Sequence, residues 1–184
     1  MPRQTHLKPA LSLACAALLL AGCADSGPEP PPAAAAADSN APEPRIARPC
    51  GQGETIIFAC TPEPDLTVAL CASADDATLQ YRETGDGTAA AWPEEGVPAS
   101  QAFRSGTLMY SGGGGAFLRF DRDGLVHTVY TGIGRGWEKA GVLVQEDGHA
   151  VRELTCNDEV TSTIGPALFE RALIPADDAG FEIP

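Results

Sequence analysis

Short runs of alternating apolar and polar residues, separated by turn residues, fill the chain from about residue 48 to its end. A period of two is the pattern of a half-buried β-strand, and the β-branched and aromatic residues of these runs favour strands. Antiparallel strands at this spacing predict an all-β fold, a small sandwich or barrel. Eight strands are predicted, at 54–60, 66–73, 77–83, 102–110, 115–121, 125–131, 140–146 and 149–156.

Two hairpins and one helix are marked by local signals. The segments Asp121–Gly124 and Glu146–Gly148 each end in a glycine, which adopts positive φ in a tight turn. Proline is favoured in the first turn of a helix, so a short C-terminal helix is predicted over Pro166–Leu173.

The first 47 residues have a different pattern. Arg3 and Lys8 precede an apolar stretch, 10–21, that is too short to span about 30 Å of hydrocarbon and ends in small residues. Residues 1–22 are therefore predicted to be a cleaved signal peptide. Residues 23–47 begin with a cysteine and are rich in proline and alanine, which predicts a tether. One domain, 48–184, remains to carry the function.

The sequence Leu20-Ala21-Gly22-Cys23 lies at the end of the predicted signal peptide, here called the leader, and resembles the lipobox of bacterial lipoproteins. The resemblance implies cleavage before Cys23, a diacylglycerol on its thiol and acylation of the new amine, so that acyl chains anchor the protein in a membrane. An ordinary signal peptide that contains a cysteine is the alternative. Ala24, in place of aspartate, implies delivery to the outer membrane, with the domain facing the periplasm.

Four cysteines remain once Cys15 leaves with the leader and Cys23 takes lipid, and an even number in an oxidising compartment predicts two disulfides. A zinc site is the competing interpretation, but the close C-x₂₋₄-C spacing is absent and no histidine lies at ligand spacing, so we expect no metal and no cofactor. Three pairings are open. Strand alternation favours Cys60–Cys156, which leaves Cys50–Cys71.

The balance of acidic and basic residues indicates which kinds of partner the protein can bind. The chain has 12 basic and 25 acidic residues, a net charge of −13. Loss of Arg3 and Lys8 with the leader leaves 10 basic residues and a net charge of −15. The electrostatic field of this negative charge repels nucleic acid, which argues against it as a partner, and attracts a cationic protein. Acidity that only keeps an exported protein soluble is the alternative.

Two glycine-rich segments are the candidate binding elements. Ser111-Gly112-Gly113-Gly114-Gly115 lies between two predicted strands. Four consecutive glycines cost conformational entropy, which close packing within the protein or close approach to a partner must offset. A phosphate cradle does not fit, because the run leads into a strand and lacks a Gly-Lys-Ser/Thr ending.

The second segment, 132–139, is interpreted as a flexible loop that presents Arg135, Trp137 and Lys139. Tryptophan and arginine are enriched at interface hot spots, and Lys139 can reach a carboxylate. The alternative is that Trp137 caps the core and the cations pair with nearby acids. A dinucleotide-binding fingerprint does not fit the all-β surroundings.

Signals for catalysis are few. His127 and His149 lie outside any nucleophile motif. The adjacent acidic pairs 75–76, 94–95 and 177–178 are explained as solvated loops. We therefore expect a protein that is not an enzyme, with a small hydrolase as the third hypothesis.

The motifs YSGGGGAFLRF at 110–120 and YTGIGRGWEKAGV at 130–142 resemble a family of uncharacterised envelope proteins and lipoproteins of Gram-negative bacteria. More distantly, the layout is similar to periplasmic and membrane-bound lysozyme inhibitors, disulfide-bearing β-barrels or sandwiches with two loops that enter the enzyme's cleft. The resemblance implies that Ser111-Gly112 matches the serine-glycine loop, and that Trp137 and Lys139 match a W-x-K element. Phe117 replaces the tyrosine of that pattern, and Ala140 intervenes before Gly141.

These observations predict an outer-membrane, lipid-anchored binding protein. Loops 111–115 and 132–139 are expected to form one surface for a cationic protein such as a lysozyme. The alternative is a structural or accessory envelope lipoprotein that binds peptidoglycan or another envelope protein.

Overall fold

The computed structural model describes residues 48–157 and 159–184. They belong to a compact unit, Glu43–Pro184, which contains the described strands, helices, core and disulfides. We therefore expect residues 48–184 to fold on their own. The predicted signal peptide, Cys23 and the tether lie outside the described residues. None of the helices in the described part is long and apolar enough to cross a membrane.

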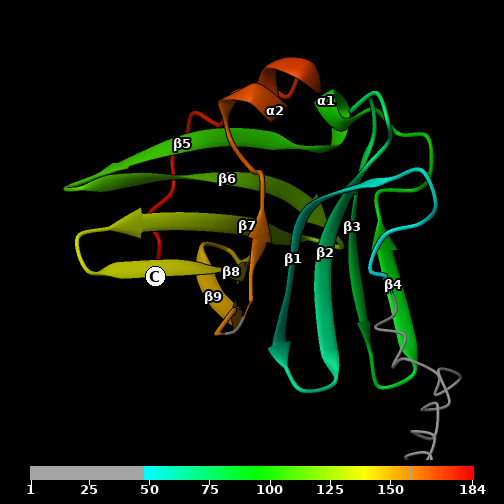
Figure 1. The fold of residues 1–184 in the computed structure, drawn as a ribbon, viewed down its shortest axis with the longest axis horizontal. Helices are drawn as coiled ribbons and strands as arrows, with labels where there is room; N and C mark the ends of the chain where they lie inside the picture. The colour runs from blue at the N-terminus through cyan, green and yellow to red at the C-terminus, as the bar shows by residue number, and fades with distance from the viewer. Residues whose placement is uncertain (1–47, 158) are drawn as a thin grey trace, which may run out of the picture. The chain divides into compact units, whose positions relative to one another are not determined.

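Two five-stranded antiparallel sheets form a sandwich-like fold, as the alternating pattern predicted (Figure 1). The first sheet has the strand order β10-β1-β2-β3-β4, and the second has the sequential order β5-β6-β7-β8-β9. The elements are β1 (Thr55–Glu63), β2 (Leu66–Ala72), β3 (Leu79–Gly85), β4 (Thr88–Trp92), α1 (Ala99–Ala102), β5 (Arg104–Tyr110), β6 (Gly113–Arg122), β7 (Leu125–Gly134), β8 (Trp137–Glu146), β9 (His149–Thr155), β10 (Thr161–Ser162) and α2 (Pro166–Arg171).

The predicted elements are all present, and three others were not predicted. The C-terminal helix is confirmed as α2. Both predicted hairpin turns adopt the expected backbone, because Asp123-Gly124 and Asp147-Gly148 have positive φ at both residues. The three missed elements are β4, β10 and α1, which are two to five residues long.

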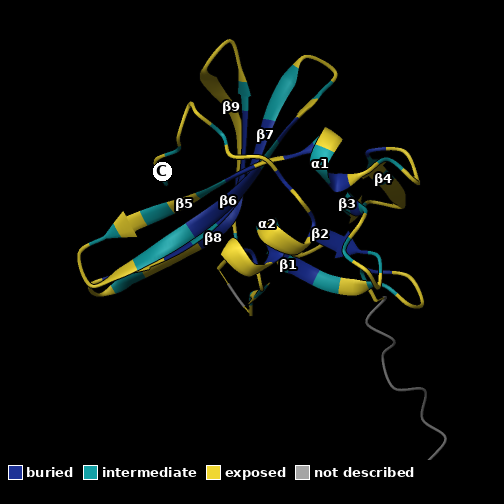
Figure 2. Ribbon diagram, turned by 90° about the horizontal axis from the view of Figure 1, so that it is seen from above, coloured by how far each residue is buried: buried dark blue, intermediate teal, exposed yellow. Residues whose placement is uncertain are grey.

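The main core lies between the two sheets and contains an aromatic cluster. Phe120 stacks on Trp92 at 4.5 Å between ring centroids and on His127 at 4.9 Å, while Tyr81 lies 5.1 Å away. Figure 2 shows buried stretches along the central strands and exposed residues at the hairpin ends. Stacked and tilted rings at these distances are favourable beyond their buried area, so this cluster fixes the second sheet against the first.

Both predicted disulfides are present. Cys60–Cys156 joins β1 to the segment that follows β9, and therefore ties the two sheets together. Cys50–Cys71 ties the segment before β1 to β2. The four cysteine sulfur atoms among the described residues are thus held in S–S bonds, whereas a zinc site needs thiolates.

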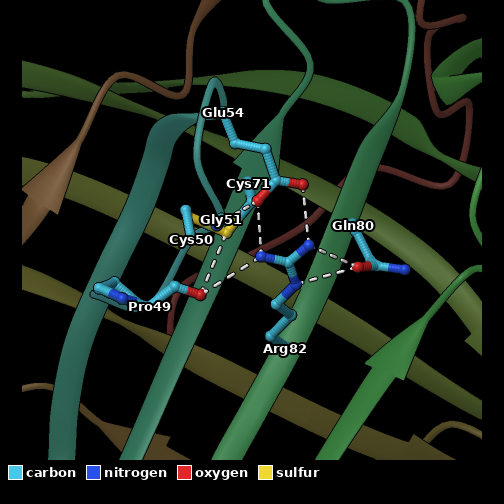
Figure 3. Close-up of a disulfide and its surroundings, with 7 residues drawn as sticks. All are labelled: Pro49, Cys50, Gly51, Glu54, Cys71, Gln80 and Arg82. Carbon is cyan, nitrogen blue, oxygen red and sulfur yellow. Dashed lines mark hydrogen bonds and ion pairs between the residues drawn. A yellow bond between two sulfur atoms is a disulfide. The ribbon is translucent and has the colours of Figure 1, made fainter. Parts of the chain in front are cut away.

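The Cys50–Cys71 disulfide has a charged neighbour, which Figure 3 shows. The Arg82 guanidinium donates two hydrogen bonds to the Glu54 carboxylate, at 2.6 and 2.8 Å. This bidentate pair lowers the pKa of Glu54. Gln80 accepts from Arg82 at 2.8 and 2.9 Å, so the guanidinium is held on both sides. The cluster fastens the segment before β1 onto β3.

Candidate functional site

The two glycine-rich segments are hairpin ends, and their predicted extent as loops 111–115 and 132–139 was wrong. Gly113–Gly115 belong to β6, whereas Gly132–Gly134 and Trp137–Lys139 belong to β7 and β8. Only Ser111-Gly112 and Arg135-Gly136 form turns. The prediction failed because glycine was taken as a loop residue, although cross-strand packing decides strand formation here.

The two turns lie side by side at one end of the second sheet. β6 and β7 are neighbours with Gly114 opposite Ile133, so the turn before β6 meets the turn after β7. The Arg135 N–H donates to the Ser111 carbonyl oxygen at 3.1 Å. Figure 1 shows both turns where the second sheet extends past β1–β4. The residues Ser111, Gly112, Arg135 and Gly136 are called the paired turns below.

The paired turns expose polar groups on a hydrogen-bonded backbone. Ser111, Gly112 and Arg135 are exposed. Gly112 and Gly136 have φ values of 81° and 82°, where glycine carries no steric penalty. Within 48–157 and 159–184 the Arg135 guanidinium forms no ion pair. A hydroxyl and a free guanidinium therefore stand together at the end of the sheet.

Behind the paired turns, aromatic rings lie over glycines of the neighbouring strand. They line the outer face, which is the face of the second sheet turned away from the first. A Cβ atom on each of these glycines would overlap or closely crowd the ring opposite. Gly134 and Gly141 of the two motifs therefore serve packing within the sheet, as glycine paired across strands with an aromatic residue does. The pairs are Gly106 with Phe117, Tyr130 with Gly141 and Gly134 with Trp137.

Trp137 is half-buried on this outer face and does not belong to the core between the sheets. Its ring meets Tyr110 edge-on, with 4.9 Å between centroids. The Tyr110 hydroxyl is buried and has no hydrogen-bond partner among the described residues. Trp137 lies two residues from Arg135 and is partly exposed.

Lys139 lies further along β8, and its ammonium group already has a partner. Its Nζ donates to the main-chain oxygen of Pro184. Of the sequence-predicted cations, Lys139 is therefore engaged, whereas the Arg135 side chain has no partner among the described residues. All five predicted binding residues, Ser111, Gly112, Arg135, Trp137 and Lys139, lie at the same end of the second sheet.

The segment 174–184, called the C-terminal segment, crosses the outer face over β5–β8 (Figure 1). Phe181 packs against Phe117 and Tyr130 at 5.3 and 5.5 Å between centroids. Arg119 donates to Asp177 at 2.6 Å and to the Gly180 carbonyl at 2.8 Å. Sequence reasoning missed this segment, although Phe181 and Ile183 stand on either side of Glu182, as apolar residues do in a half-buried extended chain.

The His127 ring and the Glu83 carboxylate have partners within the domain. His127 is 6% exposed, burial lowers its pKa, and its ring stacks on Phe120 as an aromatic packing surface. Burial raises the pKa of Glu83, but hydrogen bonds from Tyr81 and Arg152, at 2.6 and 2.9 Å, outweigh it and hold the pKa below its usual value. His149 is exposed at the β8–β9 turn.

The adjacent acidic pairs are partly fastened by hydrogen bonds. Asp75 accepts from the Ser73 hydroxyl at 2.7 Å, which lowers its pKa. Asp76 pairs with Arg171 at 2.6 Å. These carboxylates hold the loop after β2 and join it to α2, so they act in the structure of the domain.

No family model, no curated protein and no solved structure matches the chain. The resemblance to envelope lipoproteins and lysozyme inhibitors stays a prediction. The site is defined by its geometry, a pair of joined turns with an exposed serine and arginine and an aromatic ring behind them.

Proposed function

We propose that the domain is a protein-binding module of the cell envelope and that the paired turns enter the cleft of a basic lysozyme, which they inhibit. The observation that supports this most strongly is the hydrogen-bonded meeting of Ser111 and Arg135 at the projecting end of the second sheet. Two narrow turns held together in this way form one preorganised wedge, which costs little entropy to bind.

The chemistry of the wedge suits a glycosidase cleft. Such enzymes place two carboxyl groups on either side of the scissile bond. The Arg135 guanidinium can bind a carboxylate through two parallel hydrogen bonds, and the Ser111 hydroxyl can donate to the second carboxyl group. Gly112 and Gly136 have no side chain, so the backbone can approach the floor of a cleft closely.

The charge of the domain supports the same partner. The chain that remains after loss of Arg3 and Lys8 has a net charge of −15, which attracts a basic enzyme and speeds association at low salt. Trp137 supplies the aromatic anchor that interface hot spots use. Lys139 reaches a partner's carboxylate only by exchanging the Pro184 oxygen, so Arg135 is the principal cation of the proposed contact.

Arg135→Ala is expected to weaken lysozyme binding by about tenfold or more, because a desolvated charge-assisted hydrogen bond contributes about 1.5 to 3 kcal/mol. The loss is expected mainly in a faster dissociation rate, measured by surface plasmon resonance. Arg122→Ala is the matched control, since Arg122 lies at the β6–β7 turn and pairs with Asp123 at 3.4 Å. Equal losses for the two variants would show that the paired turns are not the contact.

The lipobox-like end of the leader predicts that a lipid on Cys23 anchors the protein in the membrane. Cys23→Ser is expected to abolish incorporation of labelled fatty acid and to release the protein from the membrane fraction, because only Cys23 follows Leu20-Ala21-Gly22. Metabolic labelling and fractionation of the full chain measure both effects, and Cys15→Ser is the control that should stay labelled. Acyl labelling that persists in Cys23→Ser would overturn the lipoprotein assignment.

A further inference from the structure

The edge strand β5 has a free edge over most of its length. It is the first strand of the second sheet, and among the described residues its outer edge is paired at Ser105 alone. There the Ser105 N–H donates to the Pro175 carbonyl at 2.9 Å, and the Ser105 carbonyl accepts from the Asp177 N–H at 2.8 Å. The C-terminal segment then leaves the edge.

The backbone groups beyond Ser105 are unpaired in the part of the chain that the structure describes. In a β-ladder, alternate residues direct their N–H and C=O to the same side. Thr107 and Met109 therefore point their backbone donors and acceptors to the side where Ser105 binds the C-terminal segment. No backbone hydrogen bond from another segment reaches them. A row of such groups is a template for another strand.

A groove of about 1140 Å³ runs along this free edge. β5 forms one side, α2 and the residues after it form the second, and the C-terminal segment forms the third. Its walls carry Phe169, Leu173 and Phe181, and Leu173 is 76% exposed. Met109 on the strand itself is 93% exposed. An open edge beside apolar walls is the arrangement that binds extended peptides by strand addition.

The charge of the groove indicates which kind of peptide segment it can bind. Glu170, Asp177 and Glu182 line it, and no lysine or arginine does. Asp177 is neutralised by Arg119, whereas Glu170 and Glu182 form no ion pair within the described residues. Basic side chains therefore fit beside the apolar walls. A second copy of this chain fits poorly, because it would bring the same carboxylates together.

We propose that the free edge of β5 at Thr107 and Met109 binds an extended, basic segment of another protein as an additional strand. Backbone hydrogen bonds to these two residues supply the pairing. Apolar side chains of the segment pack between Phe169 and Phe181, and its lysines or arginines lie beside Glu170 and Glu182. This site uses backbone groups of the strand edge, so it does not depend on the side chains of the paired turns or on a lysozyme partner.

The probe is the capped, fluorescein-labelled peptide Lys-Val-Lys-Val-Lys-Val-Lys, titrated into residues 48–184 and followed by fluorescence anisotropy. The peptide is expected to bind, whereas the same peptide with glutamate in place of lysine is not. Met109→Pro removes one outward N–H at an edge position that tolerates proline, and is expected to weaken binding tenfold or more. Met109→Leu keeps the N–H and is expected to bind within about twofold of the wild type.

Hydrogen exchange of the wild-type domain provides an independent readout that needs no variant. The amides of Thr107 and Met109 are expected to gain protection when the peptide is added. The proposal is overturned if the peptide does not bind at about 1 mM, or if Met109→Pro folds and binds as the wild type does. Protection at the edges β4, β9 or β10 instead of β5, or dimerisation through β5 without peptide, would overturn it as well.

Discussion

Replacing Cys60 and Cys156 together with alanine is expected to lower the free energy of unfolding by about 4.7 kcal/mol in the chain-entropy description of disulfides. The bond closes a loop of 96 residues and joins the first sheet to the end of the second. Without it, the unfolded chain gains most of the freedom that the cross-link had removed. Since a domain of this size is stable by only about 5 to 15 kcal/mol, the variant should approach the limit of folding.

Urea denaturation of residues 48–184 under non-reducing conditions measures this effect. The matched control replaces Cys50 and Cys71 with alanine. Their bond closes a loop of 21 residues, for which the same description gives about 3.3 kcal/mol. A larger loss for the Cys50–Cys71 variant than for the Cys60–Cys156 variant would contradict the role of the long cross-link.

Gly141→Ala is expected to destabilise the domain by about 3 kcal/mol, at the upper end of the usual cost of overpacking. A Cβ at residue 141 would overlap the Leu154 carbonyl oxygen and would lie 2.9 Å from the Tyr130 hydroxyl oxygen. The first obstacle is the backbone of β9, which cannot rotate away as a side chain can. Thermal and urea unfolding followed by circular dichroism measure the loss.

Gly165→Ala is the control for this substitution. A Cβ at Gly165 meets nothing within 4 Å, and its φ of 169° is extended backbone that alanine adopts readily. Its stability should change by no more than about 0.5 kcal/mol. Equal destabilisation by the two substitutions would show that Tyr130 and β9 do not constrain residue 141.

Alternation predicted most of the strands because part of each is buried on one face, as for Phe58 and Cys60 on β1. Ile56 departs from this alternation, because a register shift between Ile56 and Phe58 places it against the cluster on the opposite face. The same argument placed Cys60 in the core and Cys71 on the opposite side of its strand, which selected the observed disulfide pairs. The strand β4 was not predicted, because Thr88–Trp92 is rich in alanine, which has a low propensity for β-strands. Its strand is made by pairing with β3, a tertiary effect.

The candidate site could be predicted only in part. Its residue types stood out in the sequence, but the meeting of Ser111 and Arg135 depends on the register of β6 against β7. Local propensity also gave a wrong prediction, because glycine is typical of loops. Gly113 and Gly134 are strand residues instead: Gly113 packs against the backbone of β7, and Gly134 packs against the Trp137 ring. The structure therefore divides the motifs into packing glycines and the few exposed residues that remain for binding.

The proposed function requires that the paired turns reach a lysozyme. The most direct measurement is the rate of cell-wall lysis by chicken-type, goose-type and invertebrate-type lysozymes as purified residues 48–184 are added. The proposal predicts that at least one of these enzymes is inhibited at about micromolar concentration of the domain. If none is bound or inhibited at that concentration, the lysozyme-inhibitor proposal is contradicted and a role as an accessory envelope lipoprotein takes its place.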